Sequence, residues 1–350
     1  MLEIVGASVF FVIAVIIVIK SADIFVDNVL TVGRALGVSE LILGVTAVAM
    51  GTSFPEYGSA LIASITHPDP MGIGIVIGSN IWNLAGILGI AATITGYIKS
   101  DKKFVNRDGI MAIFTSFLLF FIMIAIYFTG EGLVSKIGAI IMFGVFVIYL
   151  RILIRDQRKD TEKLESVKEE TAKNKEPIEK IDGKIHELEE AMEEKKRPLN
   201  KKHILYVLVG LVGIVIGCRL LVDNAVVLAE LFNISPVIIS LFLIGITTSF
   251  PELVVTVTSA MKGLHDMAIG NIIGTATFNI LIGVGVPAFV VTMPVDAVSI
   301  YFDAPFMIGL YILALFIIKY GGMRLTRITG IFFISLYIVY MLLRLFVFTG

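Results

Sequence analysis

The same five-residue motif, T-S-F-P-E, stands at residues 52–56 and again 196 residues later at 248–252. Each copy combines a carboxylate and two hydroxyls with a proline, which removes an amide donor and disrupts the helical bond to the carbonyl four residues earlier. The carbonyls freed in this way belong to Gly51 and Thr247. Oxygen ligands of these kinds suit Ca²⁺ and Na⁺, whereas zinc and copper favour nitrogen and sulfur. The two glutamates are therefore candidate ligands of a hard cation.

Asparagines accompany both motifs at the same offset. Asn83 and Asn279 fall near the midpoints of the apolar segments that follow Glu56 and Glu252. Small residues let helices approach closely in lipid, and glycines recur along one side of those segments: Gly72, Gly74, Gly78, Gly270 and Gly274. We expect this packing to bring Asn83 against Glu56 and Asn279 against Glu252. A single asparagine can also serve only as a polar contact between helices, and a single hydroxyl can bond its own backbone.

The elements that position these groups are membrane-spanning helices. Hydrophobic residues form 57% of the chain and charged residues only 16%, whereas about a quarter of a soluble chain is charged. A helix needs about 20 apolar residues to cross the hydrocarbon core, and ten segments qualify, at approximately 4–32, 39–65, 71–97, 105–128, 133–154, 203–230, 235–261, 267–293, 300–319 and 327–348. Both motifs sit near the middle of their segments, where a carboxylate costs at least about 2.5 kcal/mol.

The chain repeats itself without a gap over 1–154 and 197–350. Each half holds five predicted spans, and an odd number inverts the second half, as in many secondary transporters. We therefore predict an all-α polytopic membrane protein with two inverted five-helix repeats, 1–155 and 203–350, joined by a charged linker, 156–202.

The distribution of lysine and arginine in the short loops predicts the orientation. It places the linker in the cytoplasm and both termini outside the cell membrane, with Arg344 as an exception near the outer end of the last span. We take the apolar N-terminus as the first span rather than as a cleaved signal peptide. The chain is expected to act as a monomer in the bilayer.

Other classes of function fit the sequence poorly. A net charge of −1 gives no reason to expect a nucleic-acid partner, and a single cysteine, Cys218, allows no internal disulfide. The histidines lie at predicted loops or helix ends, and neither a Ser–His arrangement nor an H-E-x-x-H motif is present, so we do not expect an enzyme. A passive cation channel could use the same carboxylates, but it would not need broken helices in inverted halves.

With these motifs the chain resembles the cation/calcium exchanger superfamily, and within it the prokaryotic type of sodium/calcium exchanger. The resemblance rests on A-M-G-T-S-F-P-E with G-S-N-I-W-N in the first half and on I-T-T-S-F-P-E with G-T-A-T-F-N in the second. It implies ten helices in two inverted halves and the exchange of several Na⁺ for one Ca²⁺, with no cofactor. It also implies that both ions share Glu56 and Glu252 as central ligands.

The resemblance extends to the residues around the glutamates. Thr52 and Thr248 would contribute carbonyls as well as hydroxyls, and Asn83 and Asn279 would complete the middle of the site. Two outer Na⁺ sites are implied, one lined by Ala49, Ser53 and Ser79 and its counterpart lined by Gly245, Ser249 and Thr275.

The chain departs from the family pattern in two places. Many sodium/calcium exchangers have an aspartate at the position of Asn279, and Thr247 replaces the glycine that Gly51 supplies in the first motif. The missing charge leaves the number of Na⁺ ions per Ca²⁺ open. The main alternative is therefore the proton/calcium branch of the same superfamily.

Overall fold

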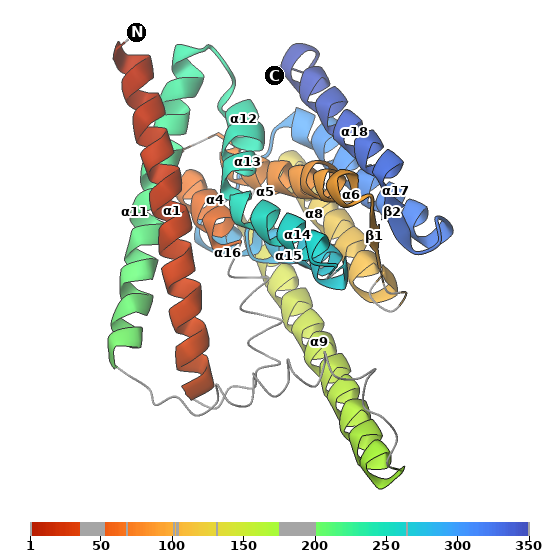
Figure 1. Cartoon of the computed structure of the whole chain (residues 1–350). Coiled ribbons are helices and arrows are strands. Elements are labelled where there is room, and N and C mark those ends of the chain that lie inside the picture. Colours follow the sequence, from red (N-terminus) through yellow and green to blue (C-terminus); the bar gives the residue numbers. More distant parts are fainter. Residues whose placement is uncertain are drawn as a thin grey trace.

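The computed structural model describes residues 2–35, 53–67, 69–100, 102, 105–130, 132–174, 201–263 and 265–348, which are predominantly helical (Figure 1). Among these residues, eight helices are long and apolar enough to cross a membrane. A ninth candidate span, from Pro236 to Met261, is bent by 48° at a break. Of the predicted span 39–65, the structure describes only the second half, as helix α4 (Phe54–Thr66). The count of ten spans therefore stays a prediction.

Helices make up most of the described part of both halves of the chain, and π-helical turns are marked η. The first half contains α1 (Leu2–Ala35), α4, α5 (Met71–Ile81), η2 (Trp82–Ile87), α6 (Leu88–Thr95), β1 (Tyr97–Lys99), η3 (Val105–Gly109), α8 (Ile110–Thr129) and α9 (Gly132–Asn174). The second half contains α11 (Lys201–Leu231), α12 (Pro236–Ile239), η5 (Ser240–Ile244), α13 (Gly245–Thr248), α14 (Phe250–Met261), α15 (His265–Leu281), α16 (Gly285–Val290), η6 (Ser299–Asp303), α17 (Ala304–Tyr320), β2 (Arg324–Thr326) and α18 (Arg327–Phe346).

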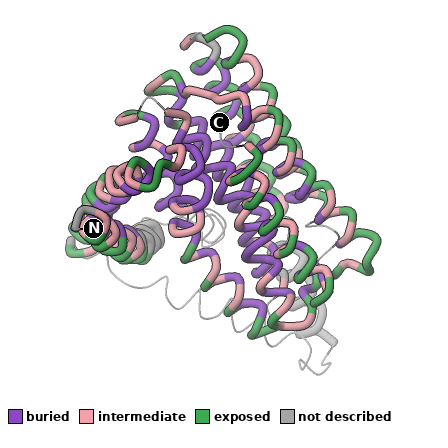
Figure 2. The backbone as a smooth tube through the Cα atoms, turned by 90° about the horizontal axis from the view of Figure 1, so that it is seen from above, coloured by how far each residue is buried: buried purple, intermediate pink, exposed green. Residues whose placement is uncertain are grey.

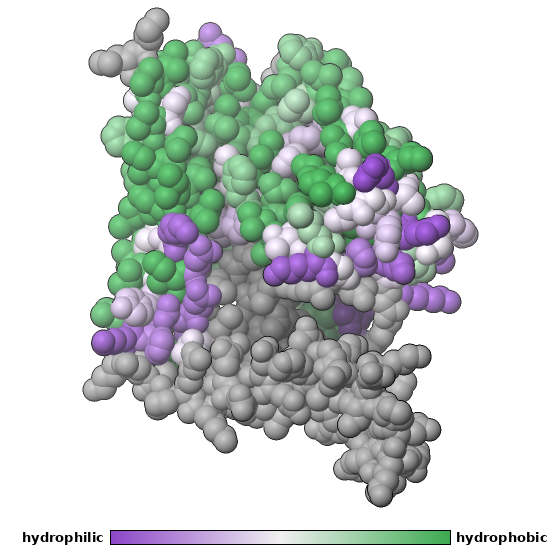
Figure 3. Space-filling model, in the orientation of Figure 1, coloured by the Kyte–Doolittle hydropathy of each residue, from purple (hydrophilic) through white to green (hydrophobic). Residues whose placement is uncertain are grey.

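Two spans form the centre of the molecule, one from each half. In the most apolar part of the span 71–95, 89% of the residues are buried, and in that of the span 268–290 the share is 78%. In the other six spans at most 39% of these residues are buried. Figure 2 shows this buried centre surrounded by helices with exposed outer faces. The outer faces are apolar, as lipid contact requires, and on the side shown in Figure 3 hydrophilic residues gather toward one end. Asn83 lies in the first of these two central spans and Asn279 in the second.

Helices α1 and α11 run side by side as a pair at one edge of the molecule (Figure 1). Three glycines of α11 permit this approach, because a Cβ at Gly210, Gly213 or Gly217 would lie within 2.8 Å of an atom of α1. Close packing through small residues is the main source of helix association in lipid. The spacing also predicts two exposed ion pairs, Lys20 with Asp23 and Arg219 with Asp223, and both are formed, at 3.9 and 2.7 Å.

One feature differs from the sequence-based prediction of plain helices and loops, and a second extends a predicted helix into the charged linker, for which a helix is one of the expected structures. Strands β1 and β2 pair antiparallel, with Ile98 opposite Leu325, and so tie together two segments that the sequence predicts as loops in opposite halves. Three residues in each strand are too few to give a recognisable alternation. Helix α9 continues the predicted span 133–154 without a break to Asn174, which makes the first part of the charged linker helical. The rest of the linker, 175–200, lies outside the described residues.

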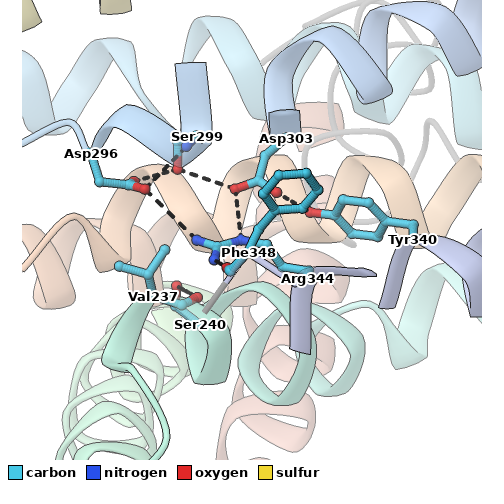
Figure 4. Close-up of polar contacts among 8 residues, drawn as sticks. All are labelled: Val237, Ser240, Asp296, Ser299, Asp303, Tyr340, Arg344 and Phe348. Atoms are coloured by element: carbon cyan, nitrogen blue, oxygen red, sulfur yellow. Dashed lines mark hydrogen bonds and ion pairs between the residues drawn. The ribbon is translucent and has the colours of Figure 1, made fainter. Parts of the chain in front are cut away.

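Arg344, the exception to the predicted charge distribution, is fully buried near the end of α18, and two aspartates compensate its charge (Figure 4). The Arg344 guanidinium donates to Asp303 Oδ2 at 3.2 Å and lies 3.7 Å from Asp296 Oδ2. Tyr340 donates to the other oxygen of Asp303 at 2.9 Å. The same residue types recur in the first half, where Tyr149 donates to the buried Asp108 at 2.7 Å beside an arginine. Arg344 therefore contributes to packing between helices and does not belong to the loop charges that predict the orientation.

We expect Asp303→Asn to lower the free energy of unfolding by about 3 kcal/mol or more, because it leaves a buried guanidinium with less compensation. Denaturation of the purified protein in detergent measures this, and a double-mutant cycle with Arg344→Met isolates the pair. The double variant should lose less stability than the two single variants together. Asp23→Asn, which breaks an exposed pair, is the control and should cost under about 1 kcal/mol. Additive losses at positions 303 and 344 would contradict a coupled pair.

Candidate cation site

Both T-S-F-P-E motifs place their glutamate in the first turn of a helix. Helix α4 begins at Phe54 and α14 at Phe250, with Glu56 and Glu252 in the first turns. In the second half, α13 ends at Thr248, and the chain bends there before α14 starts. The N-terminal end of a helix carries a partial positive charge that favours a carboxylate. The helix start that places each buried glutamate in a first turn thus stabilises its charge.

The carbonyl of Thr247, which the sequence predicts to be free of hydrogen bonds, is only partly so. The break releases it from regular helical bonding, but the amide of Ser249 donates to it. The carbonyl of Gly51, which the sequence pairs with it, lies outside the described residues, as do Thr52 and Ala49.

A reciprocal pair of hydrogen bonds joins the two motifs. Ser249 Oγ donates to Glu56 Oε1 at 2.8 Å, and Ser53 Oγ donates to Glu252 Oε1 at 3.1 Å. All four side chains are fully buried. Each serine therefore contacts the carboxylate of the opposite half, and the two bonds bring both carboxylates into one region. Sequence reasoning placed these serines only beside separate outer sites and did not predict that they cross between the halves.

Four buried oxygen atoms of the predicted ligands have no hydrogen-bond partner among the described residues. They are Glu56 Oε2, Asn83 Oδ1, Thr275 Oγ1 and Asn279 Oδ1. A buried polar atom left without a partner costs about 1–3 kcal/mol, and a bound ion would offset this cost. The amide nitrogen of Asn83 is unpartnered as well, so the predicted ligands offer four oxygens that suit a hard cation and one donor that does not.

The other predicted ligands are placed in different ways. The hydroxyls of Thr248 and Ser79 bond their own helices, to Ile244 O at 2.9 Å and to Ile75 O at 2.8 Å. The Gly245 carbonyl accepts from Ser249 Oγ at 2.9 Å. This carbonyl and the two hydroxyls remain on the inner, buried side of their helices.

Close backbone packing brings α5 against the broken helix of the second half. A Cβ at Gly78 would lie 2.0 Å from the carbonyl oxygen of Leu241 in η5, so only glycine fits. A Cβ at Gly245 would lie 3.0 Å from the amide nitrogen of Ser79. In the first half the glycine pattern therefore does mark close helix contacts. Gly72 meets α4 as expected, since a Cβ there would lie 2.9 Å from the Ala60 carbonyl, whereas Gly78 faces the opposite half.

The two asparagines sit in the buried core but do not hydrogen-bond a glutamate within the described residues. Asn279 Nδ2 instead donates to Asn80 Oδ1 at 3.2 Å, and Asn80 in turn donates to the carbonyl of Ala276 at 3.5 Å. Sequence reasoning missed Asn80, although its place in the middle of a buried span was a usable signal. Asn83 occupies the π-helical turn η2, a feature that often accompanies functional sites.

These elements define a class of protein: a multi-span membrane protein whose core holds two carboxylates in the first turns of helices, each bonded to a serine of the opposite half. The sequence model of the sodium/calcium exchanger protein family matches residues 6–155 and 202–346. The chain therefore belongs to the sodium/calcium exchanger family, within the cation/calcium exchanger superfamily.

Relatives and solved structures agree with this assignment. The chain is 28% identical to sodium/calcium exchanger MaX1 of Methanosarcina acetivorans, over 95% of this chain and 96% of that protein. It is 29% identical to inner membrane protein YrbG of Escherichia coli, over 84% and 82%. A structure of the sodium-calcium exchanger NCX_Mj soaked with 2.5 mM Na⁺ and 0.1 mM Ca²⁺ is 26% identical and has a TM-score of 0.57, over 95% of this chain and 96% of that chain. The comparisons support cation/Ca²⁺ exchange in a multi-pass membrane protein.

Proposed function

We propose that the protein is a secondary antiporter that exchanges Na⁺ for Ca²⁺ across the cell membrane by alternating access. The observation that carries this proposal is the reciprocal bonding of Ser249 to Glu56 and of Ser53 to Glu252. It gathers two carboxylates into one buried, all-oxygen site. Two negative charges compensate either one Ca²⁺ or two Na⁺, so the two kinds of ion compete for the same ligands.

Glu56 and Glu252 act as the central ligands, and the remaining candidates surround them. The unpartnered oxygens of Asn83, Asn279 and Thr275 complete the coordination in the described part of the site. Carbonyls at the helix breaks, the nearby hydroxyls and the predicted residues Ala49 and Thr52 supply further ligands. Ser53 and Ser249 then exchange their hydrogen bonds to the glutamates for contacts to the ions.

The arrangement of helices suggests how access to this site alternates. Cys218 of α11 lies 3.9 Å from the carbonyl of Pro55, inside the first motif, and a Cβ at Gly58 would lie 2.7 Å from the cysteine sulfur. The α1–α11 pair therefore packs directly on the helix that carries Glu56. Displacement of this pair along its apolar interface opens one side of the site and closes the other. We place both termini outside and the linker 156–202 in the cytoplasm.

Ca²⁺ flux into proteoliposomes tests the proposed function. An outward Na⁺ gradient should drive Ca²⁺ uptake, and uptake should stop when Na⁺ is equal on both sides. The same vesicles with a pH gradient and no Na⁺ gradient test the proton/calcium alternative, which Asn279 favours because only two carboxylates remain in the site. Uptake driven by the pH gradient alone would overturn the assignment of Na⁺. Ca²⁺ flux that needs no gradient of another ion would indicate a channel.

A further inference from the structure

A buried asparagine lies on the far side of Glu252 from the centre of the site. Asn271 of α15 is 7% exposed, and its Nδ2 donates to Thr256 Oγ1 at 3.0 Å and approaches the Glu252 carbonyl at 3.5 Å. Its Oδ1 is buried and has no hydrogen-bond partner among the described residues. The hydroxyl and the carbonyl therefore face the donor end of the amide, and the acceptor end, Oδ1, is left without a partner among the described residues.

This asparagine ends a row of oxygens along one face of α15. Asn279, Thr275 and Asn271 follow one another at intervals of four residues, a spacing that aligns side chains on one face with steps of about 6 Å. Each of the three has a buried oxygen without a partner among the described residues. On the facing helix α14, Thr256 stands one turn beyond Glu252. The row therefore leads from the central site toward the start of α15.

The first half of the chain lacks this extension. At the offset of 196 residues, Asn271 corresponds to Ile75 and Thr256 corresponds to Ala60, both fully buried. The other members of the row, Thr275 and Asn279, keep polar counterparts in Ser79 and Asn83. The polar row therefore extends beyond the central site in one half only, and in an inverted repeat this means on one face of the membrane only.

The structure identifies that face. Helix α15 starts at His265, whose ring lies 5.2 Å from that of Tyr97 in β1. The row therefore runs toward the face that carries the paired strands β1 and β2. Lys99 and Arg324 are paired across those strands, and such basic loops mark the cytoplasmic face.

We propose that the Asn271 amide turns over when a cation binds, so that its Oδ1 replaces Nδ2 and forms, with Thr256 Oγ1 and the Glu252 carbonyl, an additional Na⁺ subsite on the face that carries β1 and β2. All three ligands are neutral oxygens, which suits a monovalent cation better than Ca²⁺ because no carboxylate offsets a second charge. The subsite holds a partly dehydrated Na⁺ one turn away from Glu252, as it enters or leaves the central site on that face. This inference rests on the proposed function.

Variants in which each side-chain ligand is replaced by its counterpart in the first half test the subsite. Asn271→Ile and Thr256→Ala are to be compared with wild type in right-side-out and inside-out membrane vesicles, and the half-activating Na⁺ concentration for Ca²⁺ exchange is measured on each face. We expect a rise of about tenfold on the face with β1 and β2, which corresponds to the loss of one ligand, and no change on the other face. Thr258→Ala, the same change on the exposed side of α14, is the control and should shift neither value.

A second variant separates ligation from packing. Asn271→Asp adds a charge at the subsite and should lower the half-activating Na⁺ concentration on the same face, which a residue that only packs would not do. Equal changes on both faces, or none in either Asn271 variant, would overturn the proposal.

The proposed function and the subsite fail in different ways. If wild type shows no Na⁺-driven exchange, the proposed function is wrong. The subsite is then judged by the Na⁺-induced rise in the unfolding temperature of the purified protein. Asn271→Ile reduces that rise if the subsite exists, and an unchanged rise rejects it.

Discussion

Replacing either central glutamate by glutamine (Glu56→Gln or Glu252→Gln) is expected to abolish Ca²⁺ transport and to leave the protein folded. Glutamine keeps the size of the side chain and an oxygen that can accept the serine hydrogen bond from the opposite half. What it removes is one of two charges that compensate a divalent ion in a fully buried site. At 4 Å in a partly polar interior, each pair of unit charges is worth about 4 kcal/mol, or nearly a thousandfold in affinity.

The measurement is Na⁺-driven Ca²⁺ uptake into proteoliposomes that hold equal amounts of each variant. Size-exclusion profiles and unfolding temperatures show whether the variants remain folded. Glu230→Gln is the matched control, because Glu230 is an exposed carboxylate at the end of α11 and should keep full uptake. Uptake at the wild-type rate in either folded glutamine variant would remove that residue from the site.

The sequence predicts the local structure of the site well because its cause is local. Proline acts on the turn that contains it, so the break before Pro251 and the position of Glu252 in the first turn of α14 follow from the motif alone. Burial follows from depth in the span, and both glutamates are fully buried as expected. The repeat offset then places the same features in the other half.

The contacts between the halves could not be predicted, because they depend on how helices cross. Every residue of α5 is buried, so its sequence has no polar face to show which side chains meet the other half. As a result, Asn83 was expected to make the contacts of this segment, whereas Asn80 bonds Asn279. The crossed bonds from Ser53 and Ser249 have the same origin, since helical spacing relates residues only within one helix.

Polar residues near the ends of spans were also missed. Asp108 and Asp303 each occupy a π-helical turn near the start of a predicted span, and nothing in the local sequence indicates which residues they contact. In the fold they are almost fully buried and accept hydrogen bonds from tyrosines of the following span. Their partners lie about 40 residues away in sequence, beyond the range of helical periodicity.

The substitution Asn279→Asp is expected to make the stability of the fold depend on a bound cation. Asn279 now donates to Asn80 Oδ1 at 3.2 Å, and an ionised aspartate cannot donate, so two oxygens would face each other. The new charge also adds to those of Glu56 and Glu252 in the same buried region. We expect a loss of about 3 kcal/mol in the free energy of unfolding when no Ca²⁺ is present. Ca²⁺ should restore about 2.7 kcal/mol at a hundred times its dissociation constant.

Thermal unfolding of the purified variant during a Ca²⁺ titration measures this dependence, and Asn279→Leu is the control. Leucine removes the same hydrogen bond without adding charge, so it should lower stability without increasing the response to Ca²⁺. If position 279 faces the transported ions, the aspartate should also change the Na⁺ dependence of exchange, because a third carboxylate compensates a further Na⁺. An unchanged Ca²⁺ response and Na⁺ dependence from about pH 6 to about pH 9, where an ordinary aspartate is ionised, would place the side chain outside the ion site and leave its bond to Asn80 as its role.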